Sequence, residues 1–240
     1  IANNKFLKAV SDGFMALMPV IIVGSIFSLF NSLSIQPYQE FLTNTGLKSL
    51  LAIPNLVTND MLSLYAVFFI AFNLAKGYQK DPGTAGMIAL FSFLAITPIA
   101  NTSSIINNFL TGNGITLAEG VSVPASNVLQ FEFLGAKGLF VAIIVALLST
   151  VIYAKCLDKG LSIKMPDGVP PTVTKSFAGL VPGFVIITVF MLLDRLVTLI
   201  PMNGVSGIHT FIYSLVQAPM EAFLGNNIFS FLFAIVIAQL

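Results

Sequence analysis

Long apolar runs alternate with short polar segments along most of this chain. A helix of about 20 residues is needed to cross the roughly 30 Å of bilayer hydrocarbon, and flanking Ser, Thr, Gly and Tyr residues extend the shorter runs at little cost. The pattern therefore predicts an all-α, polytopic membrane protein with about five transmembrane helices plus part of a sixth. The predicted spans are Phe14–Leu33, Met61–Leu74, Ala85–Ile99, Leu139–Tyr153, Phe177–Leu199 and the run that starts at Ile228.

The sixth apolar run stops at Leu240 after only 13 residues, and the sequence begins on Ile1 rather than on methionine. Because about 20 helical residues are needed for a span, this run is too short to cross a bilayer alone. We therefore expect the chain to be a fragment of a longer membrane protein.

Two polar segments interrupt the apolar pattern. The segment 101–138 carries Gly-Asn-Gly between β-favouring residues, which predicts a small hairpin outside the bilayer. The segment 202–227 places Ile208, Ile212 and Leu215 on one helical face together with Val216, and this spacing predicts an amphipathic helix in the membrane interface.

Composition agrees with a membrane protein, since 56% of the residues are hydrophobic and only 9% are charged. The net charge of +1 and the scattered basic residues argue against nucleic acid as a partner. Because Cys156 and His209 are the only cysteine and the only histidine, we expect no disulfide, no metal site and no cofactor.

The basic residues predict the orientation, because Lys and Arg near the ends of spans resist translocation. With a cytoplasmic N-terminus, the inside segments hold 2 + 2 + 4 = 8 basic residues and the outside segments hold 3. The inside residues are Lys5, Lys8, Lys76, Lys80, Lys155, Lys159, Lys164 and Lys175, and the outside ones are Lys48, Lys137 and Arg195.

Several side chains have both a chemical and a structural interpretation. His209 would bind a ligand or anchor the interfacial helix, and Cys156 would be a reactive thiolate or a structural residue at a helix end; the structural role is favoured for both. Asp194 and Arg195 would form an intramembrane pair or reach water near the headgroups, with the second favoured. Surface roles are favoured over catalysis or sugar binding for Glu119, Glu132, Glu221, Asn101, Asn107, Asn108 and Asn127.

Small residues recur every four positions along the fourth predicted span. Such a stripe allows another helix to approach closely, either within the chain or across a subunit interface. The stripe consists of Gly138, Ala142, Ala146 and Thr150.

The stretch "KMPDGVPPTVTKSFAGLVPG" at Lys164–Gly183 resembles the segment before the fifth span of enzyme IIC permeases of the lactose, cellobiose and chitobiose family, which belong to the bacterial phosphotransferase system. Similar family-like stretches occur in the same order at the first, third and fourth spans: "KFLKAVSDGFMALMPVIIVGSIF", "LAKGYQKDPGTAGMIALFSFL" and "LGAKGLFVAIIVALLSTVIY". In physical terms, the prolines of the first stretch stiffen a cytoplasmic connector, and Ser176 is a candidate cap for the next helix.

The resemblance implies a permease of a phosphoenolpyruvate-dependent system that imports a β-linked disaccharide: cellobiose, diacetylchitobiose or lactose. It also implies that a phosphocysteine on a separate IIB subunit, itself supplied through IIA, phosphorylates the sugar. Family sugar-binding residues would lie past Leu240, so we assign no catalytic residue and expect this chain alone to be inactive. The location implied is the bacterial plasma membrane, in a homodimer.

The expected domains follow from the same resemblance: an N-terminal scaffold and dimerisation domain at 1–200, the interfacial segment at 201–226, and the truncated start of the substrate-binding half at 227–240. The connector would expose Lys164, Asp167 and Lys175 where IIB docks, or it would be only a structural turn. Two other functions stay open at this point, an ion- or proton-coupled secondary transporter and a purely structural dimerisation module.

Overall fold

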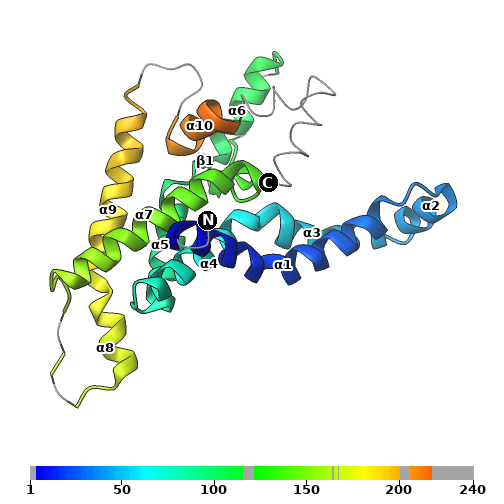
Figure 1. The fold of residues 1–240 in the computed structure, drawn as a ribbon. Coiled ribbons are helices and arrows are strands. Elements are labelled where there is room, and N and C mark those ends of the chain that lie inside the picture. Colours follow the sequence, from blue (N-terminus) through cyan, green and yellow to red (C-terminus); the bar gives the residue numbers. More distant parts are fainter. Residues whose placement is uncertain (1–3, 116–121, 164, 167, 201–205, 218–240) are drawn as a thin grey trace.

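The computed structural model describes residues 4–115, 122–163, 165–166, 168–200 and 206–217. These residues form ten α-helices and one two-stranded sheet, which confirms the predicted helical membrane fold (Figure 1). The helices are α1 Lys5–Ser32, α2 Gln36–Asn44, α3 Leu47–Thr58, α4 Leu62–Gly77, α5 Pro82–Ile96, α6 Thr102–Gly112, α7 Leu139–Asp158, α8 Pro171–Ala178, α9 Leu180–Val197 and α10 Ile208–Ile212; the strands are β1 Ile99–Asn101 and β2 Asn127–Leu129.

Four helical segments in the described part are long and apolar enough to span a membrane: Lys5–Ser32, Leu47–Gly77, Ala136–Asp158 and Val173–Val197. The predicted span at Ala85–Ile99 corresponds to α5, an apolar helix of 15 residues. At 1.5 Å per residue α5 is about 22 Å long, so its flanking segments have to complete the crossing. The run from Ile228 lies outside the described residues.

Helix α4 lies at the centre of the bundle and packs against α1, α5 and α7. Its buried residues include Val67, Ile70 and Ala71, all with no exposed surface. Helix α9 packs on the α5 and α7 side of this bundle, away from α1 (Figure 1). The core is therefore formed by parts of five helices with α4 in the middle.

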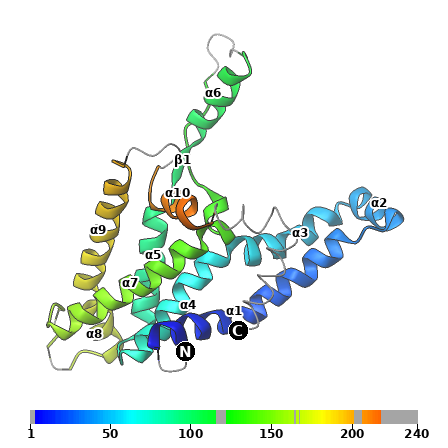
Figure 2. The ribbon, with the colours of Figure 1, turned by 45° about the horizontal axis from the view of Figure 1, so that its top comes forward.

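The C-terminal half of α1 forms, together with α2 and α3, an arm that extends to one side of the bundle (Figures 1 and 2). The far half of α1 packs along α3, and the side-chain amide of Asn59 donates to Ser25 Oγ across this contact at 3.3 Å. Interhelical hydrogen bonds of this kind hold helices together where the surroundings are apolar. The apolar pattern did not predict α2 and α3, because Gln, Asn and Pro residues interrupt it.

The predicted hairpin is present, with β1 and β2 paired antiparallel so that Ile99 lies opposite Leu129. Between the strands stands α6, a helix that the sequence pattern did not predict and that projects from the bundle (Figure 2). Asn101 caps this helix, since its side-chain oxygen accepts the N–H of Ser103 at 2.9 Å. Asn101 thus has a local structural role.

The connector before the fifth predicted span is partly helical. Pro171 is the first residue of α8, where the missing N–H and fixed φ of proline suit a helix start. Ser176 lies inside α8, so its prediction as the cap of the next helix is wrong; Gly179 stands at that boundary and gives α9 no side-chain cap. The predicted interfacial helix corresponds to α10 and the π-helical turn Tyr213–Gln217, although Leu215 and Val216 are exposed.

The small-residue stripe of α7 packs inside the chain. Ala142, Ala146 and Thr150 have no exposed surface, and the Thr150 hydroxyl, which donates to Ala146 O at 2.7 Å, also lies 3.5 Å from Ala71 O of α4. Gly138 is equally confined, since a Cβ there would lie 1.8 Å from the carbonyl oxygen of Phe133. The stripe therefore offers no surface to a second copy.

We predict that Gly138→Ala lowers the free energy of unfolding of the full-length protein in detergent by about 1–3 kcal/mol, and with it the unfolding midpoint. The reason is that the added methyl group must displace the backbone at Phe133. The matched control is Gly112→Ala, at the end of α6, where a Cβ meets nothing within 4 Å. Size-exclusion chromatography of heated samples measures both. Equal midpoints for the two variants would contradict the packing described here.

Candidate functional site

One end of the bundle carries a network of charged residues around the turn 78–81, which joins α4 to α5. Lys5 at the start of α1 lies over the Tyr78 ring, 3.7 Å from its centroid. Lys80 pairs with Asp158 at the end of α7, with 2.5 Å between Nζ and Oδ1. We call this region the charged end; its turn links the termini of α1, α4, α5 and α7.

Asp81 is the central residue of the charged end. Its carboxylate caps α5 by accepting the N–H of Thr84 at 2.9 Å, and Lys175 Nζ of α8 lies 3.6 Å from its other oxygen. Partial burial raises the pKa of Asp81, but the hydrogen bonds from Thr84 and the charge of Lys175 outweigh burial, so that the pKa lies below its usual value. Asp81 is therefore ionised at neutral pH and ties α8 to the first turn of α5.

Of the three predicted docking residues, the structure places only Lys175. Its side chain is 62% exposed at the charged end despite the contact with Asp81. Lys164 and Asp167 lie outside the described residues. Lys175 is therefore available to a partner that approaches this end, while the other two stay predictions.

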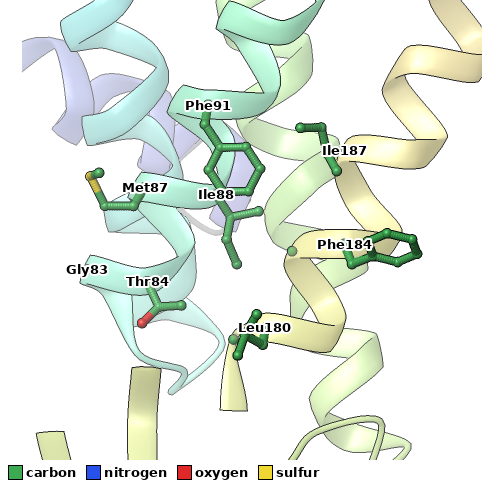
Figure 3. Close-up of a pocket in the computed structure, with 10 residues that line it drawn as sticks. Gly83, Thr84, Met87, Ile88, Phe91, Leu180, Phe184 and Ile187 are labelled. Atoms are coloured by element: carbon green, nitrogen blue, oxygen red, sulfur yellow. The ribbon is translucent and has the colours of Figure 1, made fainter. Parts of the chain in front are cut away.

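An apolar groove of about 650 Å³ opens between α5 and α9, next to the charged end. Figure 3 shows Met87, Ile88 and Phe91 on the α5 side and Leu180, Phe184 and Ile187 on the α9 side. Thr84 brings the only side-chain hydroxyl among the groove residues. The groove therefore lacks the convergent polar groups that a sugar site needs, and its chemistry suits hydrocarbon.

His209 lies at the opposite end, near the hairpin, and is fully buried. Its ring lies between those of Phe93 and Phe133, with both centroid distances at 5.1 Å. The Thr97 hydroxyl donates to Phe93 O at 2.8 Å, so it accepts from His209 Nε2 at 3.4 Å, and the proton is assigned to Nε2. His209 thus anchors α10 to the end of α5 rather than facing a ligand.

Asp194 and Arg195 do not pair with each other in the described part of the chain. Asp194 Oδ1 accepts the N–H of Ile208 at 2.7 Å, so that a residue of α9 caps the start of α10. Arg195 is exposed, and its guanidinium lies 3.4 Å from the Thr198 hydroxyl. Asp194 and His209 together fix α10 against α9 and α5.

The other candidate residues lie in structural or surface positions. Cys156 is buried at the end of α7, and the exposed carboxylate of Glu132 pairs with Lys137 at 2.6 Å. Asn107 and Asn108 are exposed on α6, as is Asn127 on β2. Glu119 and Glu221 lie outside the described residues. Residues 4–115, 122–163, 165–166, 168–200 and 206–217 contain no cluster of three or more His, Cys, Asp or Glu side chains that would hold a metal.

A helical bundle with several membrane-length helices, a network of charged residues at one end and a hairpin at the other defines a polytopic membrane protein. The particular family follows from comparison with known proteins. The family model described as "Phosphotransferase system, EIIC" matches residues 11–239, so the chain belongs to this family of membrane components.

Curated relatives agree with this assignment. The oligo-beta-mannoside-specific EIIC component of Bacillus subtilis (strain 168) is 37% identical over 242 residues, which cover 99% of this chain and 50% of that protein. The cellobiose-specific EIIC component of Geobacillus stearothermophilus is 32% identical over 246 residues, covering 100% of this chain and 51% of that protein. The chain thus spans about half the length of these relatives.

A solved structure has the same fold. The crystal structure of the transporter ChbC, the IIC component from the N,N'-diacetylchitobiose-specific phosphotransferase system, matches with a TM-score of 0.75 and 32% identity. The match covers 93% of this chain and 49% of that chain. The fold described here is therefore that of one half of a known IIC transporter.

The hydrophobic pattern missed Asp81 as the organising residue of the charged end. The local signal was present, since Asp81 followed by Pro82 is a strong helix start, with a capping side chain before a proline in the first turn. The partner Lys175 could not be inferred from it, because Lys175 belongs to α8, which only the fold brings next to Asp81.

We predict that His209 makes stability fall as pH decreases from about 6.5 to about 4. Burial lowers the pKa of His209 from 6.5 to about 4, so the unfolded chain binds a proton in this range and the folded chain does not. The loss approaches about 3 kcal/mol near pH 4. His209→Gln keeps a donor for Thr97 but does not titrate, so its unfolding midpoint in detergent should depend less steeply on pH. Parallel pH profiles for the two proteins would show this interpretation to be wrong.

Proposed function

We propose that the full-length protein is the membrane permease of a phosphoenolpyruvate-dependent sugar phosphotransferase system and that this chain is its N-terminal scaffold. The observation that carries the proposal is the EIIC family match over residues 11–239, together with the fold shared with a IIC transporter. Phosphorylation by phospho-IIB, supplied through IIA, would be coupled to import.

The proposed substrate is a β-linked disaccharide. Relatives named for oligo-beta-mannoside and cellobiose and a solved structure named for N,N'-diacetylchitobiose support this class. Components named for lactose are more distant, at 26% identity over 82% of this chain. Cellobiose or diacetylchitobiose is therefore preferred over lactose.

We predict that vesicles containing the full-length protein take up labelled cellobiose or diacetylchitobiose and recover it inside as the sugar phosphate. Uptake should require IIA, IIB and a phosphoryl donor, because the chemistry that traps the sugar belongs to IIB in this proposal. Chromatography of the vesicle contents gives the measurement. Accumulation of unmodified sugar, driven by a proton or sodium gradient, would reject the proposal in favour of a secondary transporter.

The secondary transporter has little support among the described residues. Its candidate site residue, Asp194, lies near the end of α9, where Oδ1 caps α10, and no ion pair joins it to Arg195 in the described part of the chain. Oδ1 of this carboxylate therefore has a structural role. The described helices thus offer no midplane carboxylate of the kind that ion coupling requires.

We propose that the charged end faces the cytoplasm of a bacterial cell and receives IIB. Lys5, Lys80 and Lys175 gather there, which agrees with the excess of basic residues in cytoplasmic segments. A phosphorylated partner is negative around its phosphoryl group, so exposed Lys175 would attract it. Lys164 and Asp167 remain part of this proposed docking surface.

We predict that Lys175→Glu raises the KM of the full-length permease for phospho-IIB by roughly fivefold, equivalent to about 1 kcal/mol, with little change in kcat. Asp81→Asn should not mimic this effect, since asparagine still caps α5 while Lys175 stays charged. Sugar phosphorylation at varied IIB concentration gives both constants.

Lys48→Glu, on the exposed start of α3 at the tip of the arm, is the matched charge-reversal control and should leave the KM for IIB unchanged. An unchanged KM in Lys175→Glu would show that Lys175 is not in the docking surface. A raised KM in Asp81→Asn as well would show that Lys175 acts only by holding α8.

A homodimer is also part of the proposal, with the arm as the candidate interface. Because the α7 stripe is buried, contacts between subunits have to use other faces. Helix α1 exposes a row of large apolar side chains, which would face lipid or a second subunit: Met15, Met18, Ile22, Ile26 and Leu29. A monomeric mass for the full-length protein in mild detergent would contradict this part.

A further inference from the structure

A polar cavity of about 460 Å³ lies at the hairpin end, in the region where β1, α9 and α10 come together (Figure 2). Its lining includes Gln130 after β2, Asp194 near the end of α9 and Ser206 before α10. Its volume falls within the roughly 300–1,000 Å³ typical of small-molecule sites. Unlike the groove between α5 and α9, this cavity has polar groups from three separate segments.

These three side chains keep hydrogen-bonding capacity within the described part of the structure. Gln130 is fixed through its backbone, whose N–H donates to Pro98 O at 3.1 Å, while its side-chain amide bonds to no described group. Asp194 uses Oδ1 for the N–H of Ile208 and keeps Oδ2. Ser206 donates through its backbone N–H to Thr210 Oγ1 at 2.8 Å and keeps its hydroxyl. The backbone is thus held while the side-chain polar atoms remain available.

The end of α5 adds further acceptors. Ala95 and Ile96, in the last turn of α5, line the cavity, and no described N–H beyond the helix donates to their carbonyl oxygens. The C-terminal end of a helix carries partial negative charge, which here adds to the Asp194 carboxylate. The cavity therefore favours ligands that donate hydrogen bonds and disfavours anions.

We propose that this cavity is a binding subsite for an unphosphorylated sugar. A sugar hydroxyl donates to a carboxylate or carbonyl oxygen and accepts from an amide or hydroxyl, and the cavity provides all of these groups. A sugar phosphate is repelled by Asp194 and the end of α5, so the subsite separates the substrate of the proposed reaction from its product. This inference rests on the proposed function, in which the hairpin end faces outward and meets the sugar first.

The experiment uses the full-length protein with Gln130→Met and Ser206→Ala, which remove side-chain polar atoms that bond to no described group. Each variant should raise the KM for uptake of labelled cellobiose by roughly fivefold, as expected for the loss of one hydrogen bond, with an unchanged maximal rate. Equilibrium binding in detergent without IIB should weaken by the same factor. Cellobiose phosphate should compete poorly for wild-type binding.

Two further variants sharpen the test. Asp194→Asn should also weaken binding, yet its side-chain oxygen can still accept the N–H of Ile208, so α10 stays capped. Gln36→Met, on α2 at the tip of the arm, is the matched control and should leave uptake and binding unchanged. Unfolding midpoints measured for every variant separate a lost contact from a damaged fold.

The outcomes distinguish the subsite from the proposed function. Wild-type constants in both Gln130→Met and Ser206→Ala would overturn the subsite, even if the wild type still accumulates sugar phosphate. Weakened binding in these variants, with no sugar phosphate formed by the wild type, would support the subsite and reject the proposed function. Equal competition by cellobiose and its phosphate would also overturn the subsite, because the Asp194 carboxylate and the end of α5 should repel the phosphate.

Discussion

The close approach of three helices to α4 is the constraint on which the rest of the structure depends. Each neighbour meets α4 through small residues: Gly13 of α1 lies against Ile70, Gly86 of α5 lies against Phe68, and Ala146 and Thr150 belong to the α7 stripe. In a bilayer, apolar side chains gain little from leaving lipid, so helix association relies on packing and on interhelical hydrogen bonds. Close contacts around α4 are therefore what holds the bundle together.

The polar contacts between helices that are distant in sequence lie mainly at the two ends of the bundle. At the charged end, Asp81 caps α5 and contacts Lys175, while Lys80 reaches Asp158 of α7. At the hairpin end, Asp194 caps α10, and His209 packs between two aromatic rings. Both sets join helices that are distant in sequence. The ends thus fix the relative positions of the helices.

The sequence predicted the membrane class, the main helices, the hairpin and the small-residue stripe, because each depends on a local repeat or on composition. It did not predict α2 and α3, because polar residues interrupt the apolar pattern there. It also could not pair Asn59 with Ser25, since their hydrogen bond forms only when the fold brings α1 and α3 together. The same limit applies to the site residues. Asp194 and His209 were recognisable as unusual in an apolar chain, but their roles depend on Ile208 and Thr97, which the fold alone brings to them.

The position of α10 connects these features to transport. Asp194 and His209 hold α10 against α9 and α5, and these two helices also enclose the apolar groove nearer the charged end. The helices of this half are thus held together at both ends of the bundle and around α4. Sugar recognition at the hairpin end would then require only side chains that do not take part in holding α10. Gln130 and Ser206 meet this condition. In the proposed permease, the scaffold would therefore contribute side chains to sugar binding without giving up the contacts that hold α10 in place.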